Sequence, residues 1–451
     1  MVKIQTLLKP HKPLIRPKLP ELPQEILTEI FTFNVGHGFD WRSEILGCAL
    51  VSKAWYAAAR PVFYSKYALY SPSCLTRFEK RLKRDPAITN LVRRIQVETS
   101  VVTDDDQPCP IELRTLPGVQ EMTWTNTEPW AVPLQASRGV QQLLGLFPNL
   151  RTLHISTPFE SIEQLKTFLA YCGPIRGLSL DYNLRFGGAS VSTSSLSTPP
   201  DAKDPCPRFT MKDLERLEIL RPFGSNFDWV YYHLVCESMP KLRSLRIDEE
   251  GMSLRVLCLL LKKVSSTLTH LSLDTKELAD HRGTYRIPRL YCQHNPFPPL
   301  PELQFIAIGT LTTEYWPMNL LDRICINFLG ELRAPALRTL QLTLHTPSPT
   351  KLVDLLECYN WTLFFTVLMT MFPELSQIVL CIIMEVEFGR AWRNKLEALA
   401  VRYVRWKCPC CADKIKTSMQ FSVEMLYPSN LQEPFPENPM SDGEYDLDED
   451  H

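Results

Sequence analysis

One short pattern recurs along most of this chain: an apolar residue, two variable residues, a second apolar residue, one variable residue and a third apolar residue. Side chains two positions apart in a strand lie on the same face, so the second and third apolar positions predict a short strand with one buried face. The intervals leave room for a helix or loop before the next strand, which predicts an α/β fold of stacked units. The copies begin at Val92, Val119, Leu150, Ile175, Leu214, Leu242, Leu268, Leu303, Leu337 and Leu375, the first two being the weakest.

The copies have to pack against one another, because a single unit of this size cannot bury its own apolar face. Their first positions are separated by 25 to 39 residues between 92 and 375, about 31 on average. A proline lies two residues ahead of several copies, where it ends a preceding helix and favours extended backbone. Helical patterns between copies are expected at 161–171, 252–264 and 351–368. The sequence therefore predicts a solenoid with one continuous core over roughly residues 90–385.

This array resembles leucine-rich repeat proteins, in a degenerate form. Its units exceed the length of about 20–29 residues usual for that class. The asparagine that the class places after the third apolar position occurs once, as Asn183. The longest interval contains residues 187–209, rich in Gly, Ser, Thr and Pro, which predicts a disordered insertion. Chance occurrence of the pattern in a Leu-rich protein would explain one copy, but hardly eight or ten in sequence.

The variable positions beside the buried ones are expected to form a polar row of mixed charge on the other face of the sheet. Such a row could hold and orient a protein target through charge-assisted hydrogen bonds. A solvated sheet face without any ligand fits the same residues equally well. The candidate target-binding residues are His154, Arg216, Glu218, Arg246 and His270.

Ahead of the repeats lies a short segment with three helical patterns. Residues 22–31 carry an apolar stripe, and Pro23 suits the first turn of a helix because its missing N–H needs no partner there. Ser43 is expected to cap a second helix and Ser52 a third, which Pro61 should close. Three helices over so few residues make a very small core, and such modules usually need a partner.

Three separated blocks in this segment, residues 22–31, 50–55 and 59–64, closely resemble the F-box motif over about residues 19–64. Together with the repeats, this resembles the fungal-type F-box-like proteins with degenerate leucine-rich repeats. A helical bundle without a partner would also show apolar stripes, but it has no reason to reproduce all three blocks. The resemblance implies that the module binds the Skp-type adaptor of a cullin-based (SCF) ubiquitin ligase. The adaptor-binding residues it implies are Leu22, Pro23, Ile26, Leu27, Ile30, Phe31, Leu50, Val51 and Trp55.

Composition and missing motifs argue against several other functions. The formal net charge of -1 gives no general attraction to nucleic acid or to an anionic membrane. Phosphate-binding glycine loops and the common hydrolase, kinase and metalloprotease motifs are absent from the sequence. The apolar run at 361–372 is too short to span a bilayer. We therefore expect no catalytic residues, no metal and no cofactor.

One cysteine cluster leaves a further alternative open. Cys408, Cys410 and Cys411 include a C-x-x-C spacing that could bind zinc or cycle as a dithiol. No second pair of ligands follows, which makes an enzyme or metal site here the weaker hypothesis. The other cysteines are mostly scattered singly, as in reduced cytosolic or nuclear proteins rather than secreted disulfide scaffolds.

The whole chain is predicted to be α/β, with an N-terminal three-helix F-box-like module followed by an irregular leucine-rich-repeat solenoid. The resemblance implies a substrate-recognition subunit of an SCF-type ligase, located in the cytoplasm or nucleus, whose repeats bind an unknown protein target. The alternative is a repeat scaffold without a ligase link. The predicted parts are a flexible tail at 1–18, the module at 19–66, the solenoid at 67–400, a C-terminal cap region at 401–430 and an acidic disordered tail at 431–451.

Overall fold

The chain divides into two compact units, Met1–Tyr67 and Ala68–His451, called unit 1 and unit 2 below. The predicted insertion at 187–209, the cysteine cluster at 408–411 and both predicted tails lie outside the described residues. The computed structural model describes residues 22–34, 41–102, 115–126, 134, 137–159, 161–181, 211–220, 239–248, 254–274, 297–312, 329–330, 332–346, 361–384 and 416–423.

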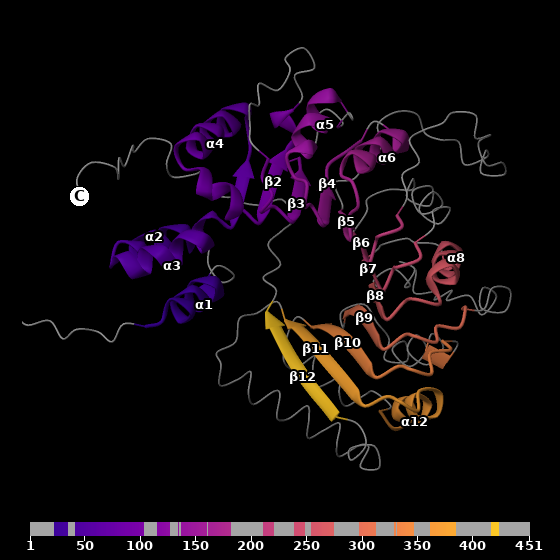
Figure 1. The fold of residues 1–451 in the computed structure, drawn as a ribbon. Coiled ribbons are helices and arrows are strands. Elements are labelled where there is room, and N and C mark those ends of the chain that lie inside the picture. The colour runs from indigo at the N-terminus through magenta and orange to yellow at the C-terminus, as the bar shows by residue number, and fades with distance from the viewer. Residues whose placement is uncertain are drawn as a thin grey trace, which may run out of the picture. The chain divides into compact units, whose positions relative to one another are not determined.

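Unit 1 contains three helices, α1 (Gln24–Asn34), α2 (Trp41–Ala49) and α3 (Lys53–Tyr64) (Figure 1). Their apolar sides meet in one core in which each buried side chain is at most 6% exposed. Six side chains are few for a stable fold, so the packing of each one contributes a large share of the stability of this unit. The core residues are Leu27, Phe31, Ile45, Ala58, Ala59 and Val62.

The ends of these helices differ in part from the sequence prediction. Ser52 caps α3 as expected, its hydroxyl accepting a hydrogen bond from the amide of Trp55 at 3.2 Å. Ser43 lies inside α2, which begins two residues earlier, so the prediction that it caps this helix is wrong. Pro61 does not close α3, which continues for three residues beyond it. Burial of Val62 in the core favours this last turn despite the hydrogen bond that proline removes.

Unit 2 is organised around a sheet in which each strand lies beside the next strand of the chain (Figure 1). The eleven strands β2 to β12 are all parallel to their neighbours. Parallel neighbours in chain order are the arrangement expected for a solenoid. The strands are β1 (Lys66–Leu69), β2 (Arg94–Glu98), β3 (Glu121–Thr125), β4 (Thr152–Ser156), β5 (Gly177–Leu180), β6 (Arg216–Leu220), β7 (Ser244–Asp248), β8 (His270–Asp274), β9 (Phe305–Thr312), β10 (Thr339–Thr346), β11 (Gln377–Met384) and β12 (Lys416–Val423).

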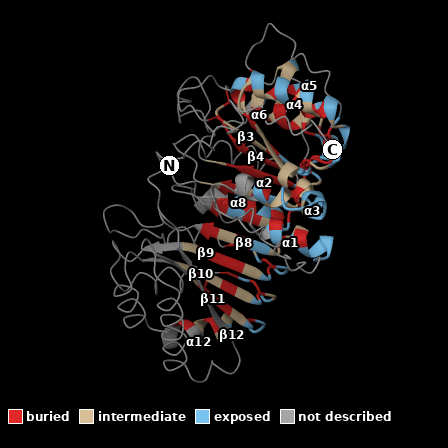
Figure 2. Ribbon diagram, turned by 90° about the vertical axis from the view of Figure 1, so that its left-hand side faces the viewer, coloured by how far each residue is buried: buried red, intermediate tan, exposed pale blue. Residues whose placement is uncertain are grey.

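The strand register brings equivalent positions of successive copies side by side. Leu153 of β4 lies opposite Leu178 of β5, and Ile155 lies opposite Leu180. From β2 to β11 the second and third apolar positions of the pattern are all at most 5% exposed. Figure 2 shows these buried positions as bands that continue across neighbouring strands. The prediction of one buried strand face, including the two weak copies at β2 and β3, is confirmed.

Helices between the strands supply the other half of the core. The ring of Phe168 in α6 packs edge-on against Trp124 of β3, with ring centroids 5.1 Å apart. The ring of Phe159 also packs against Phe168, with ring centroids 5.5 Å apart. In α8, Leu260 and Leu261 are fully buried. The helices described in unit 2 are α4 (Pro72–Arg84), α5 (Arg138–Gly145), α6 (Ile162–Tyr171), α8 (Leu254–Val264) and α12 (Trp361–Met371), with 3-10 turns at Pro86–Asn90 and Thr99–Val101.

Within the described residues, the bounds of the predicted helices agree closely with those of the observed helices. The patterns at 161–171 and 252–264 correspond to α6 and α8 within two residues. The pattern at 351–368 corresponds only in its second half, because α12 begins at Trp361 and residues 351–360 lie outside the described residues. None of the helices that the structure describes is long and apolar enough to cross a membrane.

Close approach of two repeats makes Gly118 sensitive to substitution. A Cβ atom added there would lie 2.7 Å from the carbonyl oxygen of Val92 and 2.8 Å from that of Asn90. Because both are backbone atoms, the segments ahead of β2 and β3 would have to shift, and Gly118→Ala is expected to lower the free energy of unfolding by about 1–3 kcal/mol. Urea denaturation of unit 2 measures this. Gly145→Ala is the matched control, since an added Cβ meets nothing within 4 Å there; equal midpoints for both variants would contradict the prediction.

Candidate functional site

Unit 1 carries large apolar side chains that its own core does not use. Of the described residues, seven large apolar side chains are exposed, and six of them belong to unit 1. Scattered exposed apolar residues need no explanation, but a concentration on so small a unit indicates an interaction surface. The six are Leu22 (43% exposed), Ile26 (42%), Ile30 (42%), Leu50 (74%), Val51 (61%) and Tyr56 (54%).

Helix geometry explains the exposure of the first three. Ile26 and Ile30 are four residues apart in α1, which places them on the same face of the helix. Leu22 lies another four residues earlier, just ahead of the helix, and the neighbouring Pro23 is also exposed. The carbonyl of Pro23 accepts the amide of Leu27 at 3.1 Å, so this first turn is already helical. α1 therefore presents one apolar face to the core and a second one to solvent.

Leu50 and Val51 lie in the tight turn between α2 and α3. The amide of Leu50 donates to the carbonyl of Leu46 at 3.2 Å, and that of Val51 donates to the carbonyl of Cys48 at 3.1 Å. These bonds fix the backbone of the turn, while both side chains are among the most exposed apolar groups described. A rigid turn that displays two apolar side chains loses little conformational entropy on binding a partner.

Two of the predicted adaptor-binding residues have a different position. Leu27 and Phe31 are each 1% exposed and belong to the core of unit 1. Direct contact of these two side chains with a partner is therefore excluded in this structure, and their part in adaptor binding stays a prediction in which they would support the exposed residues. Trp55 is half-buried and packs edge-on against Phe31, with ring centroids 5.7 Å apart. Whether an apolar residue of α1 faces the core or solvent depends on where α2 and α3 pack, which the sequence stripe does not specify.

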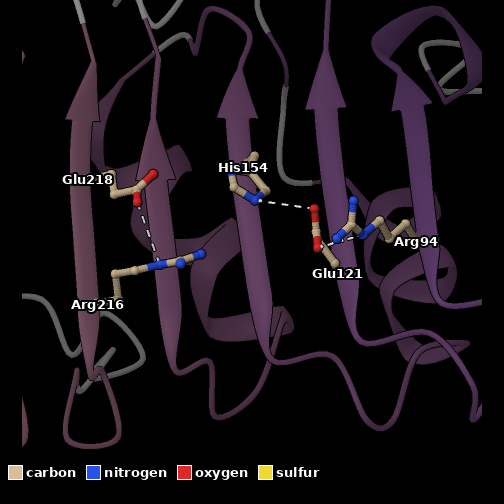
Figure 3. A network of polar contacts seen from close by, with 5 residues as sticks. All are labelled: Arg94, Glu121, His154, Arg216 and Glu218. Atoms are coloured by element: carbon tan, nitrogen blue, oxygen red, sulfur yellow. Dashed lines mark ion pairs between the residues drawn. The ribbon is translucent and has the colours of Figure 1, made fainter. Parts of the chain in front are cut away.

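The second candidate surface is the polar face of the sheet in unit 2, where Figure 3 shows five charged or titratable residues in a row. Arg94 of β2 lies beside Glu121 of β3, with Nε 3.0 Å from Oε2. His154 of β4 lies on the other side of the same carboxylate, with Nε2 3.6 Å from Oε1. Glu121 thus connects three neighbouring strands, a role that the sequence pattern did not single out.

The remaining predicted target-binding residues lie on the same face. In β6, Nε of Arg216 is 3.6 Å from Oε1 of Glu218 (Figure 3). Arg246 of β7 lies opposite Glu218 in the register. His270 of β8 lies further along, with its ring 5.6 Å from that of Phe305. The structure therefore brings the five candidates onto one face, where they are spread over β4, β6, β7 and β8.

Burial decides the charge state of His154. Desolvation lowers its pKa below the ordinary value of 6.5, Glu121 and Glu218 act in the opposite direction, and the nearby arginines lower it further. The imidazole is consequently neutral at pH 7, and its contact with Glu121 is a polar contact rather than a full ion pair.

The lowered pKa of His154 predicts a pH dependence of stability. Protonation favours the unfolded chain, where the histidine has its ordinary pKa of about 6.5. The stabilising effect of the neutral ring is fully present above that value and is lost as the pH falls from it toward the lower pKa of the folded state. His154→Gln is expected to remove this loss, which denaturant titrations between about pH 5 and pH 7.5 measure. The same loss of stability in the variant would contradict it.

Cys408, Cys410 and Cys411 lie outside the described residues. Within the ranges that the structure describes, no group of three or more His, Cys, Asp or Glu side chains is arranged to hold a metal ion.

Comparisons with known proteins add little to this geometry. No family model and no curated protein matches the sequence. Among solved structures the chain is similar to one described as "Crystal structure of Rad7 and Elc1 complex in yeast", with 13% identity over 80% of this chain and 93% of that chain. The TM-score is 0.31, which does not establish a shared fold.

Proposed function

We propose that the chain is a substrate-recognition subunit of an SCF-type cullin ubiquitin ligase, in which unit 1 binds the Skp-type adaptor and the repeats bind a protein target. The observation that carries the proposal is the exposure of Leu22, Ile26, Ile30, Leu50 and Val51 around a core that is already filled. Each of these positions falls within the blocks that resemble the F-box motif.

The energetics of unit 1 support a partner on this surface. Five exposed aliphatic side chains, in or just ahead of α1 and in the turn between α2 and α3, would bury much apolar area in a complex, at about 25 cal/mol per Å². Their exposed parts add nothing to the core of the free unit, which is formed by other side chains. A small helical unit with a second apolar surface is therefore best suited to bind another polypeptide.

The mechanism would be proximity and needs no catalytic residue in this chain. Unit 1 would hold the ligase while the sheet of unit 2 holds the target, which raises the effective concentration of target lysines near the charged ubiquitin carrier. The proposal includes location in the cytoplasm or nucleus. A repeat scaffold that binds partners without the ligase is the second candidate, favoured by the polar side chains on the sheet face between β2 and β6 (Figure 3).

Direct binding to a purified Skp-type adaptor tests the proposal. We expect a stable complex in isothermal titration calorimetry and size-exclusion chromatography, and weaker binding by Leu22→Ala with Pro23→Ala. Lack of binding by the intact chain would contradict the proposal and leave the scaffold hypothesis. Equal binding by the double variant would remove these two residues from the adaptor surface.

A further inference from the structure

Arginine recurs at one position of the repeat, immediately before the first residue of a strand. Among the ten positions that precede β2 to β11, five hold arginine and one holds glutamate, a net charge of +4 in a chain whose total is -1. The arginines are concentrated at one end of the sheet, where three of the first four strands carry one. This set, called the basic rim below, consists of Arg93, Arg151, Arg176, Arg243 and Arg338.

Backbone hydrogen bonds hold these positions in a regular row. The carbonyl of Arg151 accepts the amides of Arg176 and Gly177, at 2.7 and 2.9 Å, and the carbonyl of Arg176 accepts the amides of Glu215 and Arg216 in the same way. The same paired bonds recur at each step from β2 to β11. Successive residues of the row are therefore spaced by the distance between strands, about 4.8 Å.

The side chains of the basic rim are exposed, and the contacts described for them are weak. Arg176 lies 3.7 Å from Glu215, and both side chains are about half exposed, so this pair contributes little. Arg93 donates to the carbonyl of Gly118 at 3.3 Å. Within the part of the chain that the structure describes, the guanidinium groups of Arg151 and Arg243 have no ion-pair partner. The rim thus offers positive charge that the fold itself does not neutralise.

We propose that the basic rim binds an acidic segment of a protein partner, a stretch rich in aspartate and glutamate. The planar guanidinium forms paired hydrogen bonds to carboxylates, so a row of exposed arginines suits such a segment. The proposal rests on the proposed function in one respect: the segment would belong to the target that the ligase recruits. Glu215 interrupts the row between Arg176 and Arg243. A peptide can place an uncharged residue opposite Glu215, whereas a nucleic-acid backbone carries a negative charge at every nucleotide, so the interruption favours a peptide as the occupant.

Fluorescence anisotropy with the full chain and a labelled peptide of alternating glutamate and serine tests this. Binding is expected to weaken with salt, and to be lost when glutamine replaces glutamate in the peptide. Arg151→Glu, Arg176→Glu and Arg243→Glu together should weaken it at least about tenfold. The matched control combines Lys80→Glu, Lys262→Glu and Lys263→Glu, which change the net charge equally at exposed helical positions and should retain binding.

Three results would overturn the proposal: no binding of the glutamate peptide, equal loss in both triple variants, or tighter binding of a single-stranded oligonucleotide than of the peptide. The assay needs no adaptor, so its failure is separate from failure of the proposed function. Conversely, the arginine triple variant is expected to bind the adaptor normally, because its substitutions lie outside unit 1.

Discussion

Replacing Leu50 and Val51 together by aspartate is expected to abolish adaptor binding while leaving the fold intact. The two side chains are 74% and 61% exposed, so the free chain loses almost no packing when they are changed. In the proposed complex they would be buried, and losing both costs about 3 kcal/mol or more, a weakening of at least about 100-fold. Calorimetric titration against the adaptor measures the loss, and thermal denaturation checks that the melting temperature is unchanged.

Leu259→Asp provides the matched control for this experiment. Leu259 is the exposed large apolar residue described in unit 2, 40% exposed on α8, so its substitution introduces the same chemistry away from the proposed surface. Its adaptor affinity should equal that of the wild type. If the double variant at the turn also kept its affinity, the turn between α2 and α3 would not be part of the adaptor surface.

The sheet could be predicted because its strands repeat one arrangement of buried positions. Leu153 and Ile155 specify the same local geometry as every other copy, and errors in one copy do not change the register of the next. The sequence pattern did not predict β12, because Thr417 occupies the second position of the pattern, which is apolar in the other copies. Thr417 lies opposite Ile378 of β11. β1 and α4 lie ahead of the first copy, where the repeat pattern gives no information.

The candidate sites were less predictable because they depend on contacts between elements. The apolar stripe of α1 contains both Ile26 and Leu27, yet one is 42% exposed and the other 1%. The packing of α2 and α3 in the core of unit 1 decides between them. The pairing of His154 with Glu121 likewise requires the register between β3 and β4, in which Glu121 lies opposite Thr152. The residue types alone indicate whether such a surface is apolar or charged. Tertiary packing decides which of these side chains are exposed on the surface and which are buried.

Phe31→Ala is expected to unfold unit 1 selectively. Phe31 is 1% exposed and packs edge-on against Trp55, and removing such a ring from a core costs about 3–5 kcal/mol. A single small core rarely supplies more than about 3–5 kcal/mol, so little stability would remain. Hydrogen exchange should become fast in α1 to α3 and stay slow in β2 to β11. Protection of α1 to α3 equal to that of the wild type would contradict this.

Ile30→Ala, at the adjacent position, is expected to show the reverse behaviour. Ile30 is 42% exposed on the other side of α1, so its truncation should change the free energy of unfolding by no more than about 0.5 kcal/mol. Adaptor affinity should nevertheless fall, because the complex would lose apolar contact area. Substitution of one residue of the stripe would then affect mainly the stability of unit 1, and substitution of its neighbour would affect mainly adaptor affinity. If Ile30→Ala destabilised unit 1 as strongly as Phe31→Ala, Ile30 would belong to the core rather than to the adaptor surface.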